Sequence, residues 1–162
     1  MTDQPTTDSK PVQMLGLGLY FDDLHLGQRF RTVGRSIFEA DLMTFIGVTG
    51  MQEVMFNNLE DIAADAPGGR RFIPGLMALG IAEGLVLGPT LQKTGLAFLN
   101  MTMDIKGPVH IGDTIHVDLE VIELRRASKG ARGLVRTRNQ IINQHGDIVI
   151  EYTPLRLMKA RA

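Results

Sequence analysis

One long apolar run limits the folds that this chain can adopt. It extends from Phe72 to Gln92 (FIPGLMALGIAEGLVLGPTLQ) and carries a single charge, at Glu83. Pro74-Gly75 and Gly88-Pro89 are breakers, which predicts one helix of about 14 residues between them. Such a helix is about 21 Å long, which is too short to span a bilayer without strain. We therefore expect a helix enclosed by the protein itself.

Apolar residues occur on every side of this predicted helix, so we expect it to be enclosed on every side. They are Leu76, Met77, Leu79, Ile81, Leu85, Val86 and Leu87. Gly80, Gly84 and Gly88 recur every four residues and form a stripe that another backbone could approach. The same spacing occurs in membrane helix pairs, but the short run and the polar sequence around it favour a sheet wrapped around the helix.

The composition is that of one globular domain. The chain has 162 residues, of which 44% are apolar, and this suffices for a single core. Residues 1–14 are polar and lack the pattern of a secretory signal, so we expect a solvated tail, one domain over residues 15–162 and a cytoplasmic protein. A net charge of −1 gives no field that would attract nucleic acid or an anionic membrane. Cysteine is absent, which excludes disulfides and thiolate chemistry.

The other segments predict a sheet and two short helices. We expect a first strand over residues 29–38, an amphipathic helix from Glu39 to the glycines at 47–50, and a short helix capped by Asn57-Asn58 that ends at Ala64. Pro67-Gly68-Gly69 predicts a turn into the central helix. Alternating patterns then predict strands at 95–105, 114–125, 133–143 and 147–157. Their short connections imply an α+β fold with one antiparallel sheet around one helix.

From Tyr20 to its end, the chain resembles the MaoC-like hydratase family. The segments FEADLMTFIGVTG, IPGLMALGIAEGL, KGPVHIGDTIHVDLEVIELR and NQIINQHGDIV carry the resemblance in order. Pro108-Val109 and Gly112-Asp113-Thr114 are the most specific part, because they match a Pro-Val-x-x-Gly-Asp-Thr segment of the family. The resemblance implies a hot-dog fold and a homodimer, or a higher homo-oligomer, whose sheets join edge to edge.

The resemblance also implies a substrate class. Members handle acyl chains carried as thioesters of coenzyme A or acyl carrier protein, and active members add water to a trans-2-enoyl thioester to give the (R)-3-hydroxyacyl product. Coenzyme A would enter only as part of the substrate, so no separate cofactor is expected.

The chain departs from the family where the family carries its catalytic residues. Active members have Gly-Asp-x-Asn-Pro-x-His, whereas residues 50–56 here read GMQEVMF. Met51 stands for the Asp and Phe56 for the His, and neither side chain can transfer a proton. Glu53 is the titratable group left in this run, and Asn57 or Asn58 could hold a water molecule beside it.

The central helix supplies two further candidates. Pro74 and Gly75 lie at its N-terminus, where free N–H groups suit a developing thioester enolate oxygen; a plain helix start is the alternative. Glu83 lies two turns further on, and a lone carboxylate on an apolar helix must be paired, protonated or beside a cavity. It could be the catalytic carboxylate of a hot-dog thioesterase, a structural ion pair, or a group at a dimer interface.

Basic residues indicate where phosphates of coenzyme A could bind. Arg70-Arg71 precede the helix closely enough for a guanidinium to meet the pyrophosphate. Arg125, Arg126, Lys129 and Arg132 form a second cluster at an expected turn, and either group could simply be solvated. The four histidines, at 25, 110, 116 and 145, are expected in turns or on the solvent-exposed face of a strand. We therefore expect none of them in a buried pocket, and neither a histidine mechanism nor a His-rich metal site.

Three functions remain open from the sequence. A hydratase with a rebuilt site would use Glu53, and a thioesterase would use Glu83 with the Gly75 amide. A non-catalytic acyl-binding subunit would need neither, and would work beside a partner that carries the missing Asp and His. The order of the matching segments favours hydratase ancestry over a thioesterase.

Overall fold

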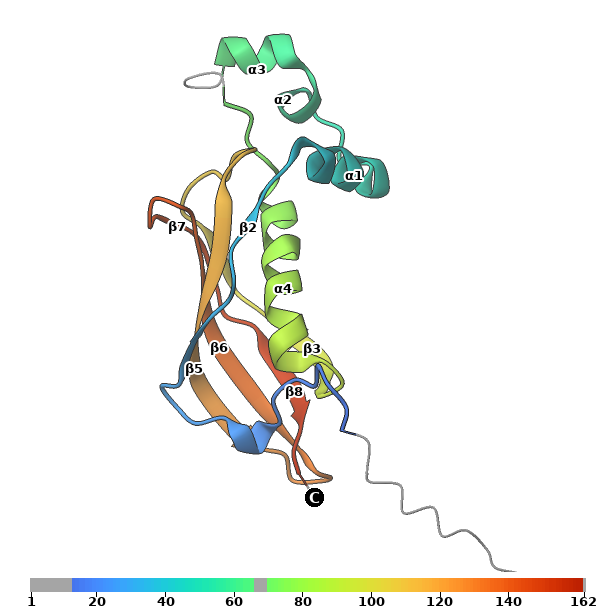
Figure 1. Ribbon diagram of the computed structural model, residues 1–162, viewed down its shortest axis with the longest axis vertical. Coiled ribbons are helices and arrows are strands. Elements are labelled where there is room, and N and C mark those ends of the chain that lie inside the picture. The colour runs from blue at the N-terminus through green and yellow to red at the C-terminus, as the bar shows by residue number, and fades with distance from the viewer. Residues whose placement is uncertain (1–12, 66–69, 162) are drawn as a thin grey trace, which may run out of the picture.

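An antiparallel sheet curves around one helix, α4, in the computed structural model (Figure 1). The structure describes residues 13–65 and 70–161, and eight strands form the sheet in this part of the chain. The elements in order are η1 (Phe21–Asp23), β1 (Arg29–Arg31), β2 (Arg35–Ser36), α1 (Glu39–Thr49), α2 (Val54–Asn57), α3 (Leu59–Asp65), α4 (Gly75–Leu91), β3 (Gly95–Asn100), β4 (Met103–Ile105), β5 (Thr114–Arg126), β6 (Arg132–Ile142), β7 (Ile148–Tyr152) and β8 (Leu155–Lys159). The predicted α+β fold is confirmed.

The long strands β5 and β6 form the centre of the sheet, and shorter strands flank them. β1 and β2 both pair with β5, while β6 pairs with β7 along one half and with β8 along the other. β4 pairs with β7 and β3 with β8, so β3 and β4 form one edge. The strands predicted at 29–38, 95–105 and 147–157 are therefore each divided in two. Pro154 accounts for the last division, because proline has no N–H to give to a ladder.

Helix α4 begins at Gly75, as predicted, but it continues past Gly88-Pro89 to Leu91. The predicted end is wrong because a distant segment supports the last turn. Main-chain amides of residues 18 and 19 donate to carbonyls at residues 92 and 90, each at 2.9 Å. These bonds satisfy carbonyls that a helix end leaves without partners, and periodicity in the sequence cannot reveal them.

One face of α4 is buried in the single chain, and the other is not. Met77, Ala78, Leu79, Ala82 and Val86 pack into the core. Leu76 and Leu87, by contrast, are 52% and 44% exposed, and the glycines at 80 and 84 are exposed between them. The expectation that the helix is enclosed on every side is therefore wrong for one protomer. We call the face that carries Leu76, Gly80, Glu83 and Leu87 the open stripe.

Helices α1, α2 and α3 lie together beyond the end of the sheet at which α4 begins (Figure 1). The predicted helix from Glu39 is confirmed: Asp41 accepts a hydrogen bond from the Phe38 N–H at its start, and Gly50 ends it with a left-handed φ of 68°. Asn58 caps α3 by accepting from the Glu60 N–H, also as predicted. These helices cover the end of the core next to Gly75.

Two predictions fall partly or wholly outside the described residues. The tail predicted over 1–14 overlaps the structure only at Gln13 and Met14, and the turn predicted at Pro67-Gly68-Gly69 lies between the two described ranges. No described helix combines the length and apolar character that crossing a membrane requires.

Candidate acyl-thioester site

The N-terminus of α4 is held against the segment that precedes β5. The Ile73 N–H donates to the Val109 carbonyl at 2.8 Å, and Phe72 forms a β-bridge with His110. Ile105 lies over Gly75, where an added Cβ would come within 2.7 Å of the Ile105 side chain. Only glycine fits this approach without displacement of Ile105. Neither the Gly75 nor the Leu76 N–H donates a hydrogen bond within the described residues, so both are available to a ligand.

A pocket of about 410 Å³ opens beside Gly75. Its lining is apolar apart from one amine and consists of Phe56, Phe72, Ile73, Pro74, Gly75, Ile105, Lys106, Gly107, Pro108, Val109 and Ile150. Pro74 and Gly75 thus lie where the sequence places a thioester carbonyl. The dipole of α4 adds positive potential at this end of the helix, so the pocket can hold an acyl group whose carbonyl oxygen points at the free amides.

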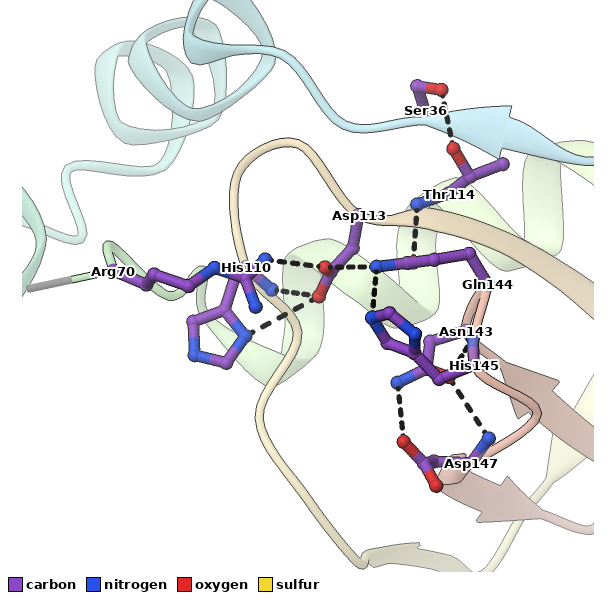
Figure 2. A network of polar contacts seen from close by, with 9 residues as sticks. All are labelled: Ser36, Arg70, His110, Asp113, Thr114, Asn143, Gln144, His145 and Asp147. Carbon is purple, nitrogen blue, oxygen red and sulfur yellow. Dashed lines mark hydrogen bonds and ion pairs between the residues drawn. The ribbon is translucent and has the colours of Figure 1, made fainter. Parts of the chain in front are cut away.

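A second pocket, of about 370 Å³, adjoins the first and shares Lys106, Gly107 and Pro108 with it. The second pocket, which we call the polar pocket, has more polar lining residues than the first; one of them is Asp113, whose carboxylate lies at the centre of the hydrogen-bond network in Figure 2. Asp113 accepts hydrogen bonds from Arg70 Nη2 at 2.7 Å, from the His110 N–H at 2.8 Å and from Gln144 Nε2 at 2.9 Å. Burial alone would raise the pKa of Asp113, but the bonds from Gln144, His110 and Arg70 outweigh it and lower the pKa to about 2.

His110 and His145 also line this second pocket. His110 Nδ1 lies 3.4 Å from the Asp113 carboxylate, and His145 Nε2 lies 3.0 Å from Gln144 Nε2. His145 is exposed and His110 is partly buried, so this is not a buried pocket. The two histidines meet here because the hairpin tip that carries His145 folds back onto the turn that precedes β5. Among the described residues, no group of three or more His, Asp or Glu side chains could hold a metal ion.

Glu83 lies on α4 against the sheet, away from both pockets. Its carboxylate accepts hydrogen bonds from the Tyr152 hydroxyl at 2.7 Å and from the buried Arg156. Burial, together with the negative charge of Glu83, raises the pKa of Tyr152 far above its usual range. Glu83 is therefore a paired carboxylate, which is the structural interpretation left open by the sequence.

Two known proteins are similar in sequence to this chain. It is 33% identical over 114 residues to the 3-hydroxybutyryl-CoA dehydratase of Methylorubrum extorquens, covering 70% of this chain and 71% of that one. It is 30% identical over 105 residues to the (R)-specific enoyl-CoA hydratase of Rhodospirillum rubrum, covering 65% and 71%. The chain belongs to the MaoC-like hydratase and dehydratase family. No model in the family collection that was scanned matches the sequence.

Solved structures confirm the hot-dog fold. A MaoC-like dehydratase from Rhodospirillum rubrum superposes with a TM-score of 0.78 at 22% identity, over 90% of this chain and 99% of that one. A Mycobacterium tuberculosis protein with a double hot-dog fold gives a TM-score of 0.80 at 21% identity, over 89% of this chain and 45% of that one. The predicted family and fold are both confirmed.

Phe56 and Met51 are the residues that the sequence resemblance matches to the catalytic pair of the MaoC-like family. Phe56, at the His position, is buried and lines the apolar pocket, with its ring edge-on to Phe72 at 5.7 Å between centroids. Met51, at the Asp position, is partly buried. Glu53 and Asn57 are exposed at the two ends of α2 and do not line the pocket beside Gly75. The pocket therefore brings together Phe56 and Gly75 but not Glu53 and Asn57.

The two arginines before α4 have different surroundings. Arg71 is largely buried, donates to the Phe56 carbonyl from Nε at 3.1 Å and from Nη2 at 2.8 Å, and pairs with Glu39. Arg71 thus fixes α2 against α1. Arg70 is half exposed at the polar pocket, where Nη2 contacts Asp113.

The second basic cluster lies at the turn between β5 and β6, at the opposite end of the sheet from Gly75 (Figure 1). Arg126 pairs there with Asp22 and lies over the Phe21 ring, 5.4 Å from its centroid. Arg132 donates to the Lys129 carbonyl. These contacts hold the N-terminal turn η1 in place and are remote from the pocket.

Sequence reasoning missed Asp113, Gln144 and Lys106 as site residues. Asp113 could have been found, because it belongs to the Gly-Asp-Thr segment that carries the family resemblance. Gln144 and Lys106 lie in stretches with no chemical pattern, and only the fold brings them beside the pocket.

Proposed function

We propose that this protein binds acyl-coenzyme A thioesters, with the thioester carbonyl at the N-terminus of α4. The observation that carries the proposal is the apolar pocket beside Gly75, at which the amides of Gly75 and Leu76 remain free. Two amides at a helix terminus form the geometry that stabilises a carbonyl oxygen or an enolate. The two relatives, by their names, act on 3-hydroxybutyryl-CoA and enoyl-CoA, which supports a coenzyme A thioester as the ligand.

The adjoining polar pocket is the proposed place for the phosphates of coenzyme A. Lys106 lines both pockets, and Arg70 lines the polar one with half of its side chain exposed. Arg71, in contrast, is already engaged with Glu39 and the Phe56 carbonyl, so we assign the phosphate contact to Arg70 and Lys106.

We propose binding rather than efficient turnover as the function of the single chain. Lys106 is the one ionisable side chain in the lining of the pocket beside Gly75. Losing a positioned acid or base typically costs about 10²–10⁴ in rate, and here both standard positions hold groups that cannot move a proton. Hydration would need Glu53 to approach from α2, or a second subunit that carries the Asp and His of the family.

We also propose a homodimer in which a second copy pairs along β3. This strand is an edge, and every residue in it is exposed, including Leu96, Phe98 and Leu99. Exposed apolar edges pair readily with another chain. The same approach would cover the open stripe of α4 and turn it into an enclosed channel.

The proposal is tested by calorimetry with saturated acyl-CoAs, enoyl-CoAs and 3-hydroxyacyl-CoAs, alongside two activity assays. We expect measurable binding, while loss of the conjugated double bond and release of free thiol stay near background. Gly75→Ala should weaken binding because its methyl group meets Ile105. Gly47→Ala is the control, because a Cβ there meets no atom within 4 Å. The proposal fails if no acyl-CoA binds to the folded protein.

Two further variants separate the alternative functions. Enoyl-CoA hydration that Glu53→Gln abolishes would replace the binding proposal by a hydratase with a rebuilt site. Thiol release that Glu83→Gln abolishes would replace it by a thioesterase. For the phosphate contact, Lys106→Ala should weaken binding of an acyl-CoA but not of the matching acyl-pantetheine, which has no nucleotide phosphates.

A further inference from the structure

Glu83 is the centre of a polar cluster inside an otherwise apolar contact between α4 and the sheet. Tyr152 and Arg156, its two hydrogen-bond partners, are 1% and 6% exposed. The charges of Glu83 and Arg156 offset each other, so the cluster has no net charge. A carboxylate has about four lone-pair positions, and these two partners occupy two of them. Glu83 can therefore accept a further hydrogen bond.

Neighbouring side chains have buried polar atoms without a hydrogen-bond partner in the described part of the chain. They are Oγ1 of Thr137 and Nε of Arg156. Asn139 is fully buried and lies opposite Tyr152 in the pairing of β6 with β7. Leaving a buried polar atom without a partner costs about 1–3 kcal/mol, so these atoms favour a polar group beside them, either a water molecule or an atom of a ligand.

Space for a small group exists beside these atoms. Thr90, Thr137 and Arg156 line a partly open cavity of about 30 Å³, whose other lining side chains are apolar. A cavity of this size holds a water-sized group. Together, the polar cluster and the cavity provide a place in the core where one small polar group fits.

The open stripe of α4 begins at Leu76, next to Gly75, and runs along the helix past Glu83. Leu76, Gly80, Glu83 and Leu87 follow the spacing of one helix face. A Cβ placed on Gly80 would meet no atom within 4 Å, so the stripe has room for a chain lying on it. Eight residues separate Gly75 from Glu83, which corresponds to about 12 Å along the helix axis. An acyl chain held at Gly75 that follows the stripe therefore meets the Glu83 carboxylate.

We infer that the preferred acyl chain carries a hydroxyl group at its far end and that Glu83 recognises this hydroxyl. The inference rests on the proposed function. A hydroxyl both donates and accepts, so it can donate to Glu83 and accept from an unused donor of the cluster. A methyl end would leave those groups without partners. A carboxylate end would place a second negative charge beside Glu83 and lose the donor that Glu83 needs.

Three series of acyl-CoAs test this inference by calorimetry. They end in a methyl, a hydroxyl or a carboxylate group, and each series is lengthened by one methylene at a time. We expect one length at which the hydroxyl-ended chain binds at least about tenfold more tightly than the methyl-ended chain, because hydrogen bonds to charged groups are the stronger class. The carboxylate-ended chain of that length should bind more weakly than the hydroxyl-ended one.

Glu83→Gln should bring the ratio between the hydroxyl and methyl affinities towards one. Glu53→Gln, the same change at an exposed position on α2, should leave the ratio as in the wild type. Thermal unfolding checks that both variants fold. If Glu83→Gln does not fold, the three series measured on the wild-type protein still test the inference. Equal affinity for methyl and hydroxyl ends at every length would overturn the inference. Absence of binding in all three series would instead overturn the proposed function.

Discussion

Arg70 Nη2 lies 2.7 Å from Asp113 Oδ1, which joins the segment before α4 to the turn before β5. The same carboxylate accepts a bond from Gln144 in the hairpin between β6 and β7. Three segments that are distant in sequence therefore meet at one charge. Asp113 lines the polar pocket, which Lys106, Gly107 and Pro108 separate from the apolar pocket.

Asp113→Asn should lower the free energy of unfolding by about 2 kcal/mol at neutral pH. The pKa of Asp113 is lowered from 3.8 to about 2 in the folded protein. A group with a lowered folded pKa stabilises the protein above its unfolded pKa, and this stabilisation is lost as the pH falls through the folded pKa. The difference between wild type and variant should therefore shrink between about pH 4 and pH 2, as measured by urea unfolding.

Asp104→Asn serves as the control, because Asp104 is an exposed carboxyl on β4. It should change stability little, with no trend across the acidic range. A difference between wild type and Asp113→Asn that stays constant from neutral to acidic pH would contradict the role given to this carboxylate.

The sequence was informative about α4 and the strands because their patterns are local. Pro74-Gly75 marks the start of the helix, and alternation over residues 114–125 marks β5. The end of α4 could not be predicted, because amides from residues 18 and 19 support its last turn. Nor does an apolar residue such as Leu76 reveal whether its own sheet or a second chain covers it.

The candidate site could be predicted to a smaller extent. Gly75 follows from its place at a helix start, and the pairing of Glu83 follows from the cost of burying a lone carboxylate. The contacts of Arg70 and Arg71 could not be predicted, because adjacent arginines with the same chemistry face opposite sides of the chain. Arg70 lines a pocket, whereas Arg71 holds α2 in place. Tertiary packing alone determines this difference.

Gly133→Ala should destabilise the protein by about 1–3 kcal/mol. An added Cβ would come within 2.2 Å of the Phe21 ring, so the ring must leave its place below Arg126. Urea unfolding measures the cost. Phe21→Ala provides the control, since in that background Gly133→Ala should cost much less. Equal costs in both backgrounds would show that the ring is not the obstacle.

Substitution of both Leu96 and Leu99 by Lys should convert the proposed dimer into a monomer of 17.8 kDa. Both side chains are exposed on β3 in the single chain, so lysine there should cost the protomer little. Charges on an edge strand oppose pairing with another chain. Light scattering measures the mass. Val33→Lys, at a position that is 79% exposed outside β3, is the control and should leave the dimer intact. A wild-type mass of one chain would refute the dimer directly.

Gly80→Ala should stabilise the protomer and weaken acyl-CoA binding at the same time. Alanine is favoured over glycine inside a helix by about 1 kcal/mol, and a Cβ at this position meets no atom of the chain within 4 Å. The added methyl group would, however, lie on the open stripe along which the acyl chain is proposed to run. Thermal unfolding and calorimetry measure the two effects. Gly47→Ala, in α1 with equal free space, should give the same stabilisation with unchanged binding. If Gly80→Ala leaves binding as strong as Gly47→Ala does, the acyl chain does not follow the stripe.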